Sequence, residues 1–105
     1  MVEPVSVLFG GIPVRDFEAA AQWYERLLDR PPDMRPHDHE ACWKLTDEAW
    51  LYVVRDAERA GNALITIIGD ELPGVDGTRG EEGGLETLVV TDPDGNSIKF
   101  AKPPA

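Results

Sequence analysis

Val14-Arg15-Asp16, followed by the segment Phe17 to Leu28, decides the fold of this chain, because it joins the end of a strand to one amphipathic helix. Asp16 is a suitable N-cap, since its carboxylate can accept hydrogen bonds from the first backbone amides of the helix. The apolar residues that follow recur at helical spacing on one face: Phe17, Ala20, Ala21, Tyr24, Leu27 and Leu28. Pro31 and Pro32 cannot continue a helix, so the pattern predicts a helix over 17–28.

Strands are expected on both sides of this helix. Trp43, Trp50 and Tyr52 supply large strand-forming side chains around the Asp47-Glu48 turn, which predicts a hairpin. Asp92-Pro93-Asp94-Gly95-Asn96 suits a tight reversal between two short apolar runs. The expected strands cover residues 5–14, 41–46, 49–55, 62–68, 85–91 and 96–102.

Two segments have weaker patterns. Residues 33–40 are polar and predict either a loop or a weak edge strand. Residues 70–84 are rich in glycine and acid and show no helical period. Within them, the run from Pro73 to Gly84 is expected to be either a mobile lid or a disordered connection.

The composition predicts one folded domain, residues 1–105, with an acidic surface. The chain has 105 residues and is 42% hydrophobic, which is enough for one core but not for two. A formal net charge of −10 argues against nucleic acid and against an anionic membrane as partners, since both would repel the protein. The same charge fits a well-solvated surface or a site for cationic ligands.

The sequence also predicts a location in the cytoplasm. Cys42 is the only cysteine, so an internal disulfide is excluded and a reducing compartment is expected. Met1-Val2-Glu3-Pro4 has neither the basic region nor the apolar core of an export signal. No apolar run approaches the length of a membrane span.

Three motifs give the chain a resemblance to the vicinal oxygen chelate superfamily, which includes glyoxalase I, extradiol dioxygenases and the bleomycin-resistance proteins. They are Ile12-Pro13-Val14-Arg15-Asp16, Ala21-Gln22-Trp23-Tyr24-Glu25-Arg26-Leu27-Leu28 and Asp92-Pro93-Asp94-Gly95-Asn96-Ser97-Ile98. The resemblance implies an α+β fold with a curved mixed sheet, built from two βαβββ modules around a ligand cleft. The second module is expected to be shortened, with its helix reduced or missing, because 70–84 is short and glycine-rich.

The resemblance also implies where a metal would bind. Enzymes of the superfamily hold a metal on His, Gln or Glu side chains, and the matching positions here are Phe9, Tyr52, Ala63 and Lys99. None is a usual ligand of a divalent metal in such a site, and the Lys99 ammonium would repel the ion. We therefore expect no metal and no cofactor.

Strand parity with those positions predicts that Phe9, Trp43, Trp50 and Tyr52 face the open side of the sheet, where they would stack on a planar, heteroaromatic or cationic ligand. The alternative is that they fill a core or a dimer interface. Lys99 is expected on the same side, where it is solvated, binds an anionic ligand or pairs with Glu86.

Two further groups carry reactive side chains. His37 and His39, beside Asp38 and Glu40, are predicted to form a flexible polar loop rather than a metal site, because a third and fourth ligand are not evident. Cys42 lies in an expected strand; it is predicted to be a small buried side chain rather than a catalytic thiol.

Three classes of function remain open. The first is a metal-independent binding protein of the glyoxalase/bleomycin-resistance type that sequesters a cationic or aromatic small molecule. The second is a glyoxalase-like or dioxygenase-like enzyme with a non-standard site, using Tyr52 or Lys99 as acid or base; catalytic residues stay unknown. The third is an interaction-only domain. A homodimer is expected, since a shortened second module leaves strand edges and apolar surface to cover.

Overall fold

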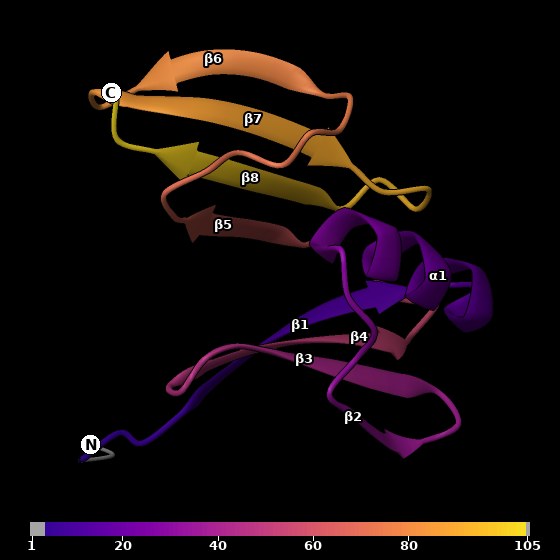
Figure 1. The fold of residues 1–105 in the computed structure, drawn as a ribbon. Coiled ribbons are helices and arrows are strands. Elements are labelled where there is room, and N and C mark those ends of the chain that lie inside the picture. Colours follow the sequence, from indigo (N-terminus) through magenta and orange to yellow (C-terminus); the bar gives the residue numbers. More distant parts are fainter. Residues whose placement is uncertain (1–3, 105) are drawn as a thin grey trace.

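The protein forms two four-stranded sheets and one helix in a computed structural model that describes residues 4–104 (Figure 1). The first half of the chain contains β1 (Leu8–Val14), α1 (Phe17–Leu28), β2 (Met34–His37), β3 (Glu40–Thr46) and β4 (Ala49–Arg55). Its sheet has the order β1-β4-β3-β2, in which β1 and β4 are parallel and the other pairs antiparallel. The polar segment 33–40 thus contributes an edge strand, one of the two predicted outcomes.

The second half repeats this arrangement without a helix. It contains β5 (Leu64–Ile68), β6 (Thr78–Glu82), β7 (Leu85–Thr91) and β8 (Ser97–Lys102), in the order β5-β8-β7-β6 with β5 and β8 parallel. Between β5 and β6 the chain crosses the sheet as an irregular segment, residues 69–77 (Figure 1). The predicted α+β class and the missing second helix are therefore confirmed.

The prediction that residues 73–84 form a mobile lid or a disordered connection is wrong for residues 78–82, because they form the strand β6. β6 pairs along its whole length with β7, from Thr78 opposite Val89 to Glu82 opposite Leu85. All five of its residues are exposed. Its sequence Thr-Arg-Gly-Glu-Glu therefore has no apolar alternation to indicate a strand, and its neighbour's backbone determines its structure.

The helix α1 begins and ends where its sequence predicts. The Asp16 carboxylate accepts a hydrogen bond from the Ala19 amide at 3.2 Å, which is the expected N-cap. At the other end Asp29 adopts a left-handed conformation, with φ of 56°, before the two prolines. Among residues 4–104 no helix is long and apolar enough to cross a membrane.

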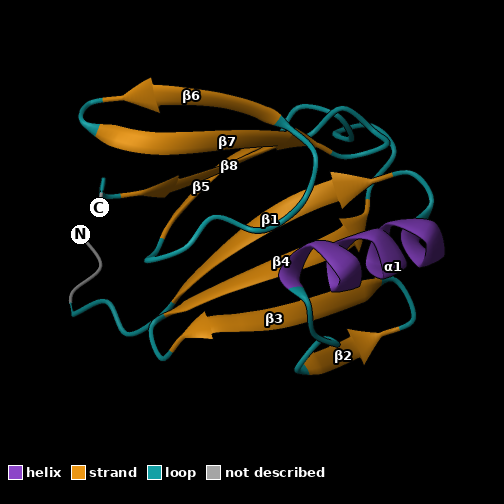
Figure 2. Ribbon diagram, turned by 45° about the horizontal axis from the view of Figure 1, so that its top comes forward, coloured by secondary structure: helices purple, strands orange, loops and turns teal. Residues whose placement is uncertain are grey.

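The core lies between α1 and one face of each sheet. Figure 2 shows α1 lying across the first sheet. Alternate residues of each strand point to this face, as the period of a strand requires. The first sheet contributes Ile12, Val14, Ala41, Trp43, Leu51 and Val53, and the second contributes Leu88, Val90, Ile98 and Phe100. The opposite faces of both sheets are not covered by α1, and the candidate site residues have to be sought there.

Candidate functional site

Three aromatic side chains lie on the face of the first sheet that points away from α1. The register pairs Phe9 of β1 with Trp50 of β4, and Gly11 of β1 with Tyr52 of β4. The rings of Phe9 and Trp50 are stacked, with centroids 5.4 Å apart and planes 13° from parallel; the Tyr52 centroid is 6.4 Å from that of Phe9. Phe9 is 45% exposed, and the other two are partly exposed. We call these three residues the aromatic face.

Gly11 provides the space that Tyr52 occupies. A Cβ atom at position 11 would lie 2.4 Å from Cζ of the Tyr52 ring, far inside van der Waals contact. The ring therefore lies against β1 only because position 11 has no side chain. The sequence does not indicate this role of Gly11, because its partner across the parallel pair becomes visible only with the register.

Trp43 does not belong to the aromatic face, so the prediction that it points to the open side is wrong. It pairs with Leu51, one residue out of phase with Trp50 and Tyr52, and it is 0% exposed in the core. Its Nε1 donates a hydrogen bond to the Arg30 carbonyl oxygen at 3.0 Å, which satisfies the buried indole N–H. Trp43 points into the core because the register of β3 with β4 places its two neighbours, Cys42 and Lys44, on the open face.

Lys99 lies on the corresponding open face of the second sheet, as predicted, but its partner is different. Its Nζ lies 2.8 Å from Oε2 of Glu82 in β6 and 3.0 Å from Oε1. The expected partner, Glu86, forms an ion pair with Lys102 instead, in which Oε2 of Glu86 lies 3.4 Å from Nζ of Lys102. The antiparallel register of β7 and β8 places these two residues opposite each other. The missed strand β6 explains this error, since it brings Glu82 beside Lys99.

The four best-defined cavities among residues 4–104 are lined by other residues. The largest, about 460 Å³, lies between α1 and the segment before β6. A second one, about 350 Å³, is lined by Gly11, Pro13, Glu58, Arg59, Asn62 and Ala63, where the two halves of the chain meet. The aromatic face is therefore an open surface beside that second cavity rather than the wall of a closed one.

Asp92 forms the centre of a buried polar network at the same junction. Its carboxylate is 4% exposed and accepts four hydrogen bonds. The donors are the Tyr24 hydroxyl at 2.7 Å, the Asp94 amide at 2.9 Å, and the amide and side chain of Asn96 at 2.9 and 2.8 Å. Burial, and next the hydrogen bond to Asp92, raise the pKa of Tyr24 above its ordinary value.

Asn96 extends the network to two other parts of the chain, β1 and the segment before β5. Its Nδ2 donates to the Pro13 carbonyl at 2.8 Å, and its Oδ1 accepts from the amides of Gly61 and Ala63 at 3.0 and 2.9 Å. The motif around Asp92 thus connects α1, β1 and the start of β5. It holds the two halves together and offers no open coordination position to a ligand.

The comparison with solved structures identifies the family. A glyoxalase/bleomycin resistance protein from Catenulispora acidiphila is 36% identical to this chain, and the match covers 93% of this chain and 98% of that one with a TM-score of 0.86. This chain belongs to the glyoxalase/bleomycin resistance protein family. The resemblance to the vicinal oxygen chelate superfamily is thereby confirmed. No family model and no curated protein matches the sequence.

More distant structures share the fold of this family member. An antibiotic binding protein from a Streptomyces species is 19% identical, with 99% of this chain and 100% of that one covered and a TM-score of 0.74. A bleomycin-binding protein complexed with bleomycin is 16% identical, with 92% and 98% covered and a TM-score of 0.66. At such identities the likeness shows the fold alone.

The positions that would hold a metal in this family do not fit one here. Phe9 and Ala63 have no donor atom, and Lys99 is a cation bound to Glu82. Tyr52 alone offers an oxygen, which is too few for a site of three or four ligands. Over residues 4–104 there is no group of three or more His, Cys, Asp or Glu side chains placed to hold a metal ion.

His37 and His39 make their contacts around the turn between β2 and β3. The His37 Nε2 atom lies 3.2 Å from Oε1 of Glu40, and its Nδ1 accepts a hydrogen bond from the His39 amide at 3.1 Å. The His39 ring packs edge-on to Phe17, with centroids 6.5 Å apart. These contacts shape the turn between β2 and β3.

Cys42 pairs with Tyr52 in the register and is 0% exposed. Burial, and next the hydrogen bond from its thiol to Glu40 Oε2 at 3.5 Å, raise the pKa of Cys42 to about 11. The thiol is therefore protonated near neutral pH, which is the opposite of what a nucleophile requires.

Proposed function

We propose that this protein binds a planar aromatic cation on its aromatic face and acts by holding the molecule, without a metal and without chemical conversion. The observation that carries the proposal is the exposed stack of Phe9 on Trp50, with Tyr52 beside it. Aromatic rings that a monomer leaves partly exposed offer a stacking surface for a flat ligand.

The charge of the protein favours a cationic ligand. The net charge of −10 attracts cations over distances of about 10 Å at moderate ionic strength. Aromatic rings also attract cations directly through their negative faces. On the open face of the second sheet Lys99 is paired with Glu82, whose side chain is 66% exposed, and we propose this ion pair as the polar contact of the ligand.

Two structural neighbours that bind small molecules support a binding function. One neighbour is an antibiotic binding protein, and another is a bleomycin-binding protein complexed with bleomycin. We extend from them only the act of binding a small molecule. Lys99 remains in the proposed site as the partner that orients Glu82, whereas Trp43 is left out because the core buries it.

We also propose that the protein is a homodimer in the cytoplasm, as expected from the sequence, with one complete aromatic face in each copy. The edges of β1 and β5 carry exposed apolar side chains, including Leu8, Leu64 and Ile68. A second copy of the chain would cover these edges.

Titration with 9-aminoacridine, a planar aromatic cation, tests the proposed function. We expect saturable quenching of tryptophan fluorescence in the wild type, and an affinity about tenfold weaker in Trp50→Ala, because the stacked ring is lost. Gln22→Ala is the control, since Gln22 is exposed on α1 and does not belong to the aromatic face. EDTA should leave the affinity unchanged. An unaltered affinity in Trp50→Ala would show that the aromatic face is not the site.

A further inference from the structure

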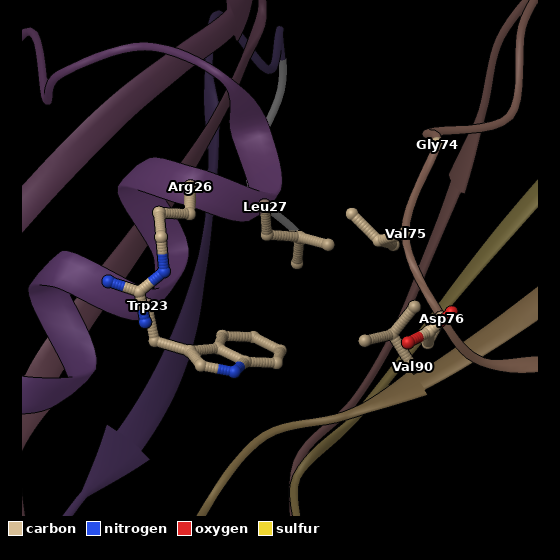
Figure 3. Close-up of a pocket in the computed structure, with 7 residues that line it drawn as sticks. All are labelled: Trp23, Arg26, Leu27, Gly74, Val75, Asp76 and Val90. Carbon is tan, nitrogen blue, oxygen red and sulfur yellow. The ribbon is translucent and has the colours of Figure 1, made fainter.

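The largest of the four cavities lies on the other side of the first sheet from the aromatic face. It occupies about 460 Å³ between α1 and the irregular segment before β6. We call it the α1 cleft. It is lined by Trp23, Arg26, Leu27, Gly74, Val75, Asp76 and Val90. Figure 3 shows Trp23 and Leu27 pointing from the helix across the gap towards Val75, Asp76 and Val90.

The cleft follows from the missing second helix. In its place, residues 69–77 cross the second sheet, and only Leu72 and Val75 pack against the core from this segment. In the described chain, residues 70–77 make no backbone hydrogen bond with other elements. A single extended segment is thinner than a helix, so it leaves space between itself and α1.

The walls of the cleft combine an apolar surface with one carboxylate. Leu27 and Val90 are buried at its base, and Val75 is partly buried. The Trp23 indole forms one wall, and the exposed Asp76 carboxylate stands on the opposite one (Figure 3). Within residues 4–104 Asp76 makes neither an ion pair nor a side-chain hydrogen bond, so its charge is available to a ligand.

We propose that the α1 cleft is a second binding site, which takes an organic ammonium ion with an apolar body. The ammonium group would lie between the Asp76 carboxylate and the face of the Trp23 ring, which attracts cations. The apolar body would cover Leu27, Val75 and Val90. The volume of the cleft falls within the range of small-molecule sites.

Arg26 gives this proposal a distinctive test. Its guanidinium lies on the helix side of the gap, near the base of Trp23 (Figure 3), and no ion pair neutralises it in the part of the chain that the structure describes. A cation in the cleft is therefore attracted by Asp76 and repelled by Arg26. Removing the two charges must change the affinity in opposite directions.

The experiment follows the three indole N–H signals in two-dimensional NMR spectra, assigned with Trp→Phe variants. Benzyltrimethylammonium should shift the Trp23 signal saturably, whereas phenylacetate, a similar molecule of opposite charge, should not. Asp76→Asn should weaken the binding about threefold, and Arg26→Gln should strengthen it by a similar factor. Asp70→Asn is the matched control, because Asp70 lies in the same segment and does not line the cleft.

Other outcomes would overturn the inference. If the Trp50 signal moves and the Trp23 signal does not, the ammonium ion binds at the aromatic face, and the function proposed above stands without a second site. Equal shifts with phenylacetate, or an unchanged affinity in Asp76→Asn, would exclude recognition of charge in the cleft. A Trp23 signal that depends on protein concentration and ignores the probe would show that another copy of the chain covers the cleft.

Discussion

At the scale of single residues, Tyr24 connects two of the family motifs, the one on α1 and the one around Asp92. Its hydroxyl donates to Asp92, and that carboxylate also holds the turn before β8. Tyr24→Phe removes one donor from a buried carboxylate, so we expect the free energy of unfolding at pH 7 to fall by about 1–3 kcal/mol. Urea unfolding measures this change. Tyr52→Phe is the control, since Tyr52 is only partly buried and makes no side-chain hydrogen bond among residues 4–104.

The wild type and Tyr24→Phe should also differ in how their stability responds to alkaline pH. The pKa of Tyr24 is raised in the folded state, so above pH 10 the unfolded chain releases a proton that the folded chain keeps. The stability of the wild type is therefore fully present below pH 10 and falls as the pH rises further. Its advantage over Tyr24→Phe should shrink by about 1.4 kcal/mol at pH 11. A difference that stays constant from pH 8 to 11 would contradict this account.

At the scale of elements, α1 is the one helix among residues 4–104, and it packs against both sheets. Asp16→Ala removes the N-cap, which we expect to lower the free energy of unfolding by about 1 kcal/mol in urea titrations. Glu18→Ala is the control, because Glu18 is exposed in the first turn and caps nothing. Equal effects of the two substitutions would mean that the cap does not stabilise the helix.

The elements also show what could be predicted from the sequence. The helix 17–28 was predictable to the residue, because its apolar period, cap and prolines are all local signals. β6 was not predictable from the sequence, since an exposed edge strand has no apolar alternation. Its pairing with β7 determines its structure. For the same reason the sequence does not indicate that Glu82 is the partner of Lys99.

The candidate site was predictable in part. Phe9, Trp50 and Tyr52 do share the open face, because β1 and β4 are parallel and in register. The sequence predicts the wrong face for Trp43, since parity along β3 follows from its pairing with β4 and from no signal within β3 itself. The α1 cleft was not foreseen, because it results from the absence of a helix across from Trp23.

At the scale of the whole molecule, the exposed apolar side chains of β1 and β5 predict self-association. Leu64 and Ile68 are 71% and 64% exposed at the edge of the second sheet, and in the described structure no strand covers them. We expect a dimer in light-scattering measurements, and a monomer for the variant that combines Leu64→Lys with Ile68→Lys. Met34→Lys, at the far edge of the first sheet and 42% exposed, should remain a dimer.

The same variants separate assembly from ligand binding. Phe9, Trp50 and Tyr52 come from one chain, so the monomeric double variant should still bind 9-aminoacridine with an affinity close to that of the wild type. A monomeric wild type would contradict the proposed dimer and leave the aromatic face intact. Conversely, a double variant that stays folded but no longer binds the cation would show that the site needs the second copy, because nothing within the aromatic face itself has been changed.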